Sequence, residues 1–238
     1  LVKWLEVPVD QSIETFFGEL CDPEVHQMDL ERAGLLQVQL AQNTKDGTYY
    51  LLLLLHHVVL DHQGAALVQN EVLKIIDDNS SVLSNPVPYR NYIANIRRLE
   101  KERDDHAFFT EMLSDVFQPT LPFGLGASQR RSSLSVHRVD ISSALADSIR
   151  EIGRRSNVSV ATIFHAAWSL VVASSSNRKD IVFGTVLSGR LQAQSGSDSA
   201  VGLFINTLPL RVQLTDQTSI DWVKKLHDSL LSLVDYEH

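Results

Sequence analysis

The stretch that decides how this chain is interpreted is Leu-His-His-Val-Val-Leu-Asp-His-Gln-Gly, residues 55–64. It follows the apolar run at residues 51–55 and precedes residues 64–77, where apolar side chains recur at helical spacing. Four titratable side chains therefore stand between an expected strand and an expected helix. Junctions of this kind often present side chains to a cleft, so we look for a functional site here.

Upstream of this stretch the sequence predicts a β-hairpin. Residues 34–41 alternate between polar and apolar side chains, and residues 43–47 supply turn chemistry. Residues 48–55 are apolar enough to predict a second strand that is wholly buried.

Downstream, the same periodicities predict helices separated by short strands. The expected elements are helices at 64–77 and 89–113, a strand at 134–141, helices at 142–156 and 159–174, strands at 180–187 and 203–214, and a helix at 219–234. This order indicates a mixed α/β protein without the strict alternation of a doubly wound fold.

Composition excludes several classes of function. A net charge of −8 argues against nucleic acid as a partner, because phosphates require a basic surface. Cys21 is the only cysteine, which excludes a disulfide framework and fits a cytoplasmic protein. The apolar run at residues 51–60 is too short to cross a membrane. The chain starts at Leu1 without a signal peptide or an initiating Met, so we expect a piece of a longer polypeptide.

The residues at 55–64 allow three interpretations. The histidines could be core residues with satisfied hydrogen bonds, with Asp61 capping the next helix. His57, Asp61 and His62 could instead hold zinc or iron, although no further ligand clusters with them in the sequence. In the third interpretation one histidine accepts a proton during catalysis and Asp61 sets the local geometry.

Four motifs in this chain resemble those of condensation domains from nonribosomal peptide synthetases. They are His56-His57-x-x-x-Asp61, the segment Tyr89–Tyr92, the run from Phe183 to Arg190 that ends in Ser-Gly-Arg, and Gly202–Arg211, which reads Gly-Leu-Phe-Ile-Asn-Thr-Leu-Pro-Leu-Arg. Their order along the chain is also that of the family.

The resemblance implies two lobes of chloramphenicol-acetyltransferase type arranged in a V, with the active site between them. Such domains are longer than this chain, so we expect a partial domain. Residues 1–125 would belong to the N-terminal lobe, 126–133 would connect the lobes, and 134–238 would belong to the C-terminal lobe.

The resemblance also implies an activity. Such domains form an amide bond by acyl transfer from a donor thioester to an acceptor amine. Both substrates are carried on phosphopantetheine arms of peptidyl carrier proteins, beside an adenylation domain, and the domain has no intrinsic cofactor or metal. The alternatives are a coenzyme-A-dependent acyltransferase of the same fold, an epimerising relative and a non-catalytic domain that recruits a partner.

The family motifs assign roles to individual residues. His57 would act on the amine as a general base or as a hydrogen-bond positioner. Asp61 would be structural and pair with Arg190 across the cleft. His56 is expected to pack in the loop, and Asn206 to satisfy backbone groups at an inter-lobe strand.

One position departs from the family pattern. The glycine that normally follows the aspartate is His62 here, and Gly64 comes two residues later. The imidazole at this place would narrow the tunnel, supply a second proton acceptor, or point away from the site.

Overall fold

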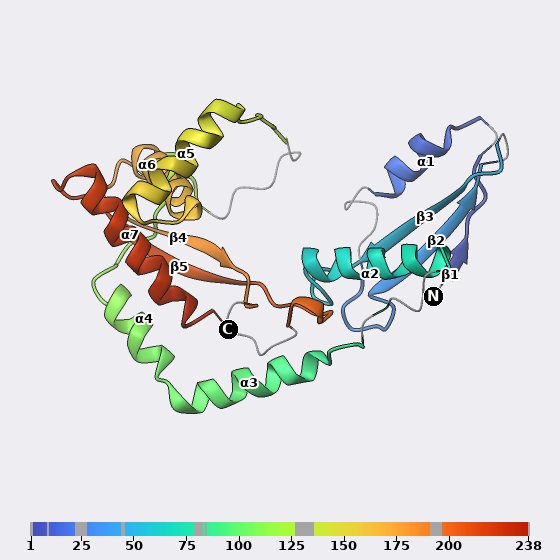
Figure 1. The fold of residues 1–238 in the computed structure, drawn as a ribbon, viewed down its shortest axis with the longest axis horizontal. Coiled ribbons are helices and arrows are strands. Elements are labelled where there is room, and N and C mark those ends of the chain that lie inside the picture. Colours follow the sequence, from blue (N-terminus) through green and yellow to red (C-terminus); the bar gives the residue numbers. More distant parts are fainter. Residues whose placement is uncertain are drawn as a thin grey trace. The chain divides into compact units, whose positions relative to one another are not determined.

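The structure is a computed structural model that describes residues 2–8, 10–21, 28–43, 46–78, 83, 85–126, 136–190 and 197–237. Its elements, in chain order (Figure 1), are β1 (Val2–Trp4), α1 (Ile13–Leu20), β2 (Leu36–Gln42), β3 (Tyr49–Leu55), α2 (His62–Ile76), α3 (Tyr89–Glu102), α4 (Asp105–Leu113), η2 (Pro122–Gly124), α5 (Ser143–Ser156), α6 (Val160–Ser176), β4 (Asp180–Leu187), η3 (Ser197–Ser199), β5 (Asn206–Gln213) and α7 (Ser219–Val234).

The chain forms two compact units. The first unit comprises Leu1–Tyr92 and Ser195–Phe204, and the second comprises Ile93–Gln194 and Ile205–His238. The expected lobe boundaries stay a prediction, and all but the first residue of the expected connection at 126–133 lies outside the described residues.

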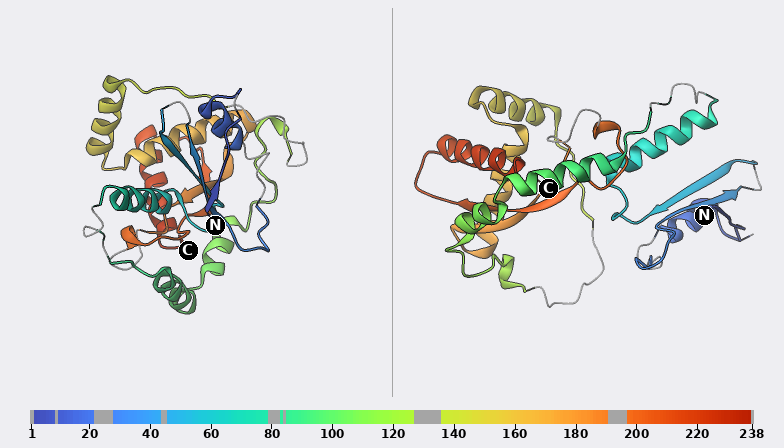
Figure 2. Two further views of the ribbon diagram at one scale, coloured as in Figure 1. Left: turned by 90° about the vertical axis from the view of Figure 1, so that its right-hand side faces the viewer. Right: turned by 90° about the horizontal axis from the view of Figure 1, so that it is seen from below.

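A three-stranded sheet organises the first unit. The strands follow the order β1-β2-β3, with β1 parallel to β2 and β2 antiparallel to β3. Leu36 lies opposite Leu55, so the expected hairpin is confirmed. Figure 2 shows α2 running beside this sheet.

The expectation that the second hairpin strand is wholly buried was wrong. The side chains of Tyr49 and Leu51 are 62% and 49% exposed. Successive residues of a strand point to opposite faces of a sheet, so a continuous apolar run does not require both faces to be covered.

The elements at the start of the chain were not expected. Strand β1 has only three residues and forms by pairing with β2, which periodicity alone does not reveal. Helix α1 begins at a standard cap, where the side chain of Ser12 accepts the backbone N–H of Thr15 at 3.2 Å.

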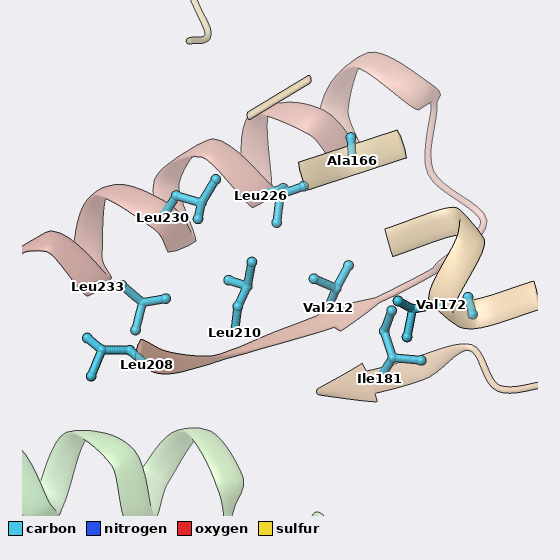
Figure 3. Close-up of a cluster of buried hydrophobic side chains, with 10 residues drawn as sticks. Ala166, Val172, Ile181, Leu208, Leu210, Val212, Leu226, Leu230 and Leu233 are labelled. Carbon is cyan, nitrogen blue, oxygen red and sulfur yellow. The ribbon is translucent and has the colours of Figure 1, made fainter. Parts of the chain in front are cut away.

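The core of the second unit lies between a two-stranded sheet and two helices. Strands β4 and β5 pair antiparallel, α6 contacts β4, and α7 contacts β5. Figure 3 shows the side chains of Leu226 and Leu230 on α7 and those of Leu210 and Val212 on β5 within one apolar cluster. Burial of these side chains is the main favourable term in the stability of this unit.

Two sequence expectations in this region were also wrong. The helix expected over 89–113 is two helices, because the side chain of Asp104 accepts the backbone N–H of Ala107 at 2.9 Å and starts α4. The strand expected at 134–141 does not form in its described part, residues 136–141. Val136 and Val139 there are more than 70% exposed, and alternation makes a strand only where a neighbouring strand pairs with it.

Within the described ranges, no single helix combines the length and hydropathy needed to cross a membrane, and only α5 with α6, bent by 105°, passes as a pair by length and composition.

Candidate functional site

The turn after β3 presents His57 to solvent. The backbone N–H of Val59 donates to the carbonyl of His56 at 3.0 Å, which closes the turn. The imidazole Nδ1 of His56 accepts the backbone N–H of Val58 at 3.1 Å, which makes Nε2 the protonated nitrogen when the ring is neutral. This hydrogen bond joins the His56 side chain to the backbone of its own turn. His57 is exposed, so it is not a core histidine.

Asp61 is the buried centre of this site, with 2% of its surface exposed. One carboxylate oxygen accepts the backbone N–H of Gly64 at 2.7 Å and caps α2. The other accepts the backbone N–H of Phe204 at 3.3 Å. A buried carboxylate is tolerated only when it is hydrogen-bonded, and these two contacts join the start of a helix to a segment 143 residues away.

That distant segment, residues 198–204, is called the returning segment here. Its backbone is held by α2 and by the chain around α3. The carbonyl of Gly202 accepts the backbone N–H of Asp61 at 3.1 Å, and the carbonyl of Asp198 accepts the side-chain amide of Gln63 at 3.3 Å. The motif at residues 56–61 and the start of the motif at residues 202–211 are therefore hydrogen-bonded to each other within the first unit.

The tyrosines of the motif at residues 89–92 hold the same segment. The hydroxyl of Tyr89 donates to the carbonyl of Leu203, and that of Tyr92 donates to the carbonyl of Phe204 at 3.4 Å. Their rings pack on the Phe204 ring at centroid distances of 5.2 and 4.4 Å. The aromatic pairs and hydrogen bonds together fix the backbone that Asp61 binds.

Glycine is required where the returning segment passes Tyr89. A β-carbon at Gly202 would lie 2.2 Å from a ring carbon of Tyr89, well inside van der Waals contact. At Gly64 a β-carbon would lie 3.3 Å from the Asp61 carboxylate. The close approach of the Tyr89 ring to the backbone of the returning segment explains the motif glycine at position 202.

The remaining predicted site residues lie at other places. His62 is the first residue of α2 and is exposed. Arg190 and Asn206 belong to the second unit. Arg190 is 6% exposed, and the side-chain oxygen of Asn206 accepts the backbone N–H of Thr207 at 2.8 Å. The pairing of Asp61 with Arg190 and the cleft between lobes stay predictions.

A second polar cluster in the second unit centres on Arg211 of β5. Its guanidinium donates to both carboxylate oxygens of Asp180 at 3.0 and 2.6 Å, and to those of Asp115 at 2.5 and 3.0 Å. These hydrogen bonds lower the pKa of the Asp180 carboxyl below its ordinary value. They lower the pKa of Asp115 in the same way and raise that of Arg211. The cluster ties the end of α4 to the β4–β5 sheet.

Sequence reasoning missed the contacts of Tyr89, Tyr92 and Phe204, although it had singled out both motifs. The aromatic residues in each motif were the available signal. Glu237, a wholly buried carboxylate, was also missed, and no pattern in the sequence pointed to it. In the described part of the chain, no three His, Cys, Asp or Glu residues are grouped so that they could hold a metal ion.

Comparison with known proteins places this chain in one family. A family model described as "Condensation domain" matches residues 8–238. The chain is 38% identical over 232 residues to malpibaldin synthetase and 40% identical over 233 residues to malpinin synthetase, both from Mortierella alpina. Each alignment covers 97% of this chain, which spans 4% and 3% of the length of those relatives.

Solved structures share the fold. The first condensation domain of the CDA synthetase matches with a TM-score of 0.73 and 18% identity, over 98% of this chain and 54% of that chain. The epimerization domain from the third module of tyrocidine synthetase B matches with a TM-score of 0.71 and 18% identity, over 99% of this chain and 57% of that chain. The expected mixed α/β fold is confirmed, and this chain covers about half of it.

Proposed function

Because this chain belongs to the condensation domain family of nonribosomal peptide synthetases, we propose that it forms an amide bond between two carrier-bound substrates. The family supports acyl transfer in general. The observation that carries the proposal for this chain is that His57 is exposed on a turn, while residues on both sides of it are held by hydrogen bonds. His56 and Asp61 hold that turn on both sides of His57. A fixed backbone with a free imidazole is the arrangement that positioned acid–base chemistry needs.

The reaction needs few groups from the protein. The acceptor amine nitrogen attacks the thioester carbonyl carbon, the amine loses a proton, the C–S bond breaks and the thiol leaves with a proton. His57 either takes the amine proton and returns it to the departing sulfur, or holds the amine by a hydrogen bond. Histidine is the side chain most often used to accept and return a proton near neutral pH, which suits the first role.

The substrates are a donor acyl group and an acceptor amine, each on the phosphopantetheine arm of a peptidyl carrier protein. An adenylation domain of the same synthetase would load the carrier, and a cytoplasmic location follows from that assembly. In this proposal Asp61 pairs with Arg190, whose planar guanidinium suits a buried carboxylate. Asn206 supports the start of β5, and His62 lies at the helix start beside the site.

The test is peptide formation by the complete domain with two loaded carrier proteins. His57→Ala should slow condensation by roughly 10²–10⁴-fold, the usual contribution of acid–base catalysis, without changing the unfolding curve. The exposed His137 is the matched control, and His137→Ala should keep the wild-type rate. A His57→Ala variant that condenses at the wild-type rate would remove the central claim.

His57→Gln separates the two roles. Glutamine can hydrogen-bond an amine but does not take its proton at neutral pH. A rate close to wild type supports positioning, and a rate as low as that of His57→Ala supports general-base catalysis.

The same assay separates the proposal from its alternatives. An epimerising enzyme, which the likeness to the tyrocidine synthetase domain brings into consideration, would change the stereochemistry of one loaded substrate without forming a peptide. Transfer from free coenzyme A thioesters would indicate the acyltransferase alternative. Binding of carriers without any product would indicate a recruitment domain.

A further inference from the structure

The second unit contains a buried carboxylate that the proposed reaction does not use. Glu237 follows α7 and has none of its surface exposed. Its carboxylate accepts the backbone N–H of Gly189 at 3.1 Å. Burying a carboxylate is unfavourable unless hydrogen bonds compensate, and a leucine would fill the same space without that penalty. The charge at this position therefore calls for a reason beyond packing.

The group that Glu237 holds is the Ser-Gly-Arg turn, residues 188–190. This turn follows β4 directly, and the last residue of that strand pairs with Asn206 at the start of β5. Gly189 has a φ of +65°, a backbone conformation that is unfavourable for residues other than glycine. The next residue is Arg190, which is buried. The carboxylate is thus bonded to the residue immediately before the arginine of the motif.

The chain that carries Glu237 is itself firmly placed. The ring of Tyr236 stacks on that of Phe108, with centroids 3.9 Å apart and planes within 12°. The guanidinium of Arg103 lies 4.9 Å from the centre of the Tyr236 ring. The backbone N–H of Tyr236 donates to the carbonyl of the buried Leu233 at 2.9 Å. These contacts fix the residue next to Glu237, so its carboxylate is a preorganised acceptor.

We propose that Glu237 is a positioning residue for the condensation reaction. It touches no substrate. It holds the Ser-Gly-Arg turn through a charge-assisted hydrogen bond. This bond sets the position of the Arg190 guanidinium, which the proposed function pairs with Asp61. The inference rests on the proposed function, because Arg190 matters to the reaction only if the domain condenses carrier-bound substrates.

The experiment compares Glu237→Gln with wild type in the complete domain, under single-turnover and steady-state conditions with loaded carriers. Glutamine keeps the volume and an acceptor oxygen but removes the charge. The expected result is a fall of kcat of roughly 10–100-fold, the scale of a small misplacement in a site, with unchanged KM for both carriers. Asp228→Asn is the matched control, because it removes the charge of an exposed carboxylate on α7. It should leave kcat unchanged.

A double variant tests whether the effect passes through Arg190. Glu237→Gln combined with Arg190→Ala should be no slower than Arg190→Ala alone, because both act on one unit. Each kcat is calculated from the concentration of folded protein. Partial unfolding of a variant therefore lowers that concentration without changing kcat. Gly189→Ala, which strains the same turn, should lower kcat in the same way.

Three results would overturn the inference while leaving the proposed function intact. They are a wild-type kcat in Glu237→Gln, losses that multiply in the double variant, and a slow Glu237→Gln beside a fully active Arg190→Ala. A wild-type domain that forms no amide bond would instead refute the proposed function.

Discussion

The two units each have a carboxylate cluster, and the clusters are built on opposite principles. In the first unit Asp61 is almost wholly buried and accepts two backbone N–H groups. In the second unit the side chain of Asp180 is 39% exposed, and Arg211 donates to both of its oxygens. Two backbone N–H groups therefore help to position the first carboxylate, whereas a guanidinium positions the second.

The Asp61 hydrogen bonds hold the backbone of the candidate site, whereas the Arg211 ion pairs hold the β4–β5 sheet to the end of α4. A carboxylate bonded to backbone N–H groups fixes the path of the chain, and removing it leaves those groups unsatisfied in the interior. An ion pair near the surface keeps water as an alternative partner and is screened by salt. Substitutions in the Asp61 cluster should therefore have large effects that do not depend on salt, and those in the Arg211 cluster smaller effects that do.

The largest effect is expected for Asp61→Ala. Loss of the carboxylate leaves the N–H groups of Gly64 and Phe204 without their acceptor, at about 1–3 kcal/mol each. The free energy of unfolding of the complete domain should therefore fall by about 2–6 kcal/mol in a urea titration. Hydrogen exchange at these two amides should also accelerate.

The matched control for Asp61 is Asp198→Ala, because Asp198 lies in the same unit and is exposed. It should change stability by less than about 0.5 kcal/mol. Equal losses of unfolding free energy in the two variants would mean that the burial of Asp61 does not account for its larger expected effect.

A smaller effect is expected for Gly202→Ala. The added methyl group would overlap the ring of Tyr89, and overpacking of this kind lowers stability by about 1–3 kcal/mol. Gly18→Ala in α1 is the control, since a β-carbon there has no neighbour within 4 Å and alanine favours a helix. Thermal unfolding of both variants checks this, and a neutral Gly202→Ala would show that the returning segment is not tightly fitted.

The smallest effect is expected for Arg211→Met, at about 1–2 kcal/mol near pH 7 and low salt. Hydrogen bonds from Arg211 lower the pKa of Asp180 in the folded state. The corresponding stability is therefore present above the unfolded pKa of about 4 and is lost as pH falls through the lower folded value. The difference between wild type and Arg211→Met should shrink in acid.

Urea titrations of both proteins at several pH values and at low and high salt measure this difference. It should also shrink at high salt, while the loss in Asp61→Ala should not. A loss in Arg211→Met that is independent of both salt and pH would remove the distinction between the two clusters.

Much of the fold was predictable from the sequence because it depends on local patterns. The hairpin, α5, α6, β4 and α7 were expected within a few residues of their observed bounds. The expectations failed where a single residue or a distant partner determines whether a helix ends or a strand forms. Asp104 splits the helix expected at 89–113, and the strand expected at 134–141 has no pairing strand in its described part.

For the candidate site, the sequence by itself determined the motifs, their order and the family to which they belong. It also determined that His57 and Asp61 stand four residues apart at the start of a helix. These features follow from residue identity and short spacing, which need no knowledge of distant contacts. A role for Asp61 in the local geometry was therefore expected.

Only the tertiary structure decided what the buried groups bind. The returning segment reaches Asp61 and the tyrosines from more than 100 residues away, and Glu237 reaches Gly189 across 48 residues. Each of these hydrogen bonds joins a side chain to a backbone group, and every residue has a backbone, so residue type alone does not specify the partner. The physical reason is that the folded chain, and not the local pattern, determines which backbone groups are buried beside which side chains and must be hydrogen-bonded there.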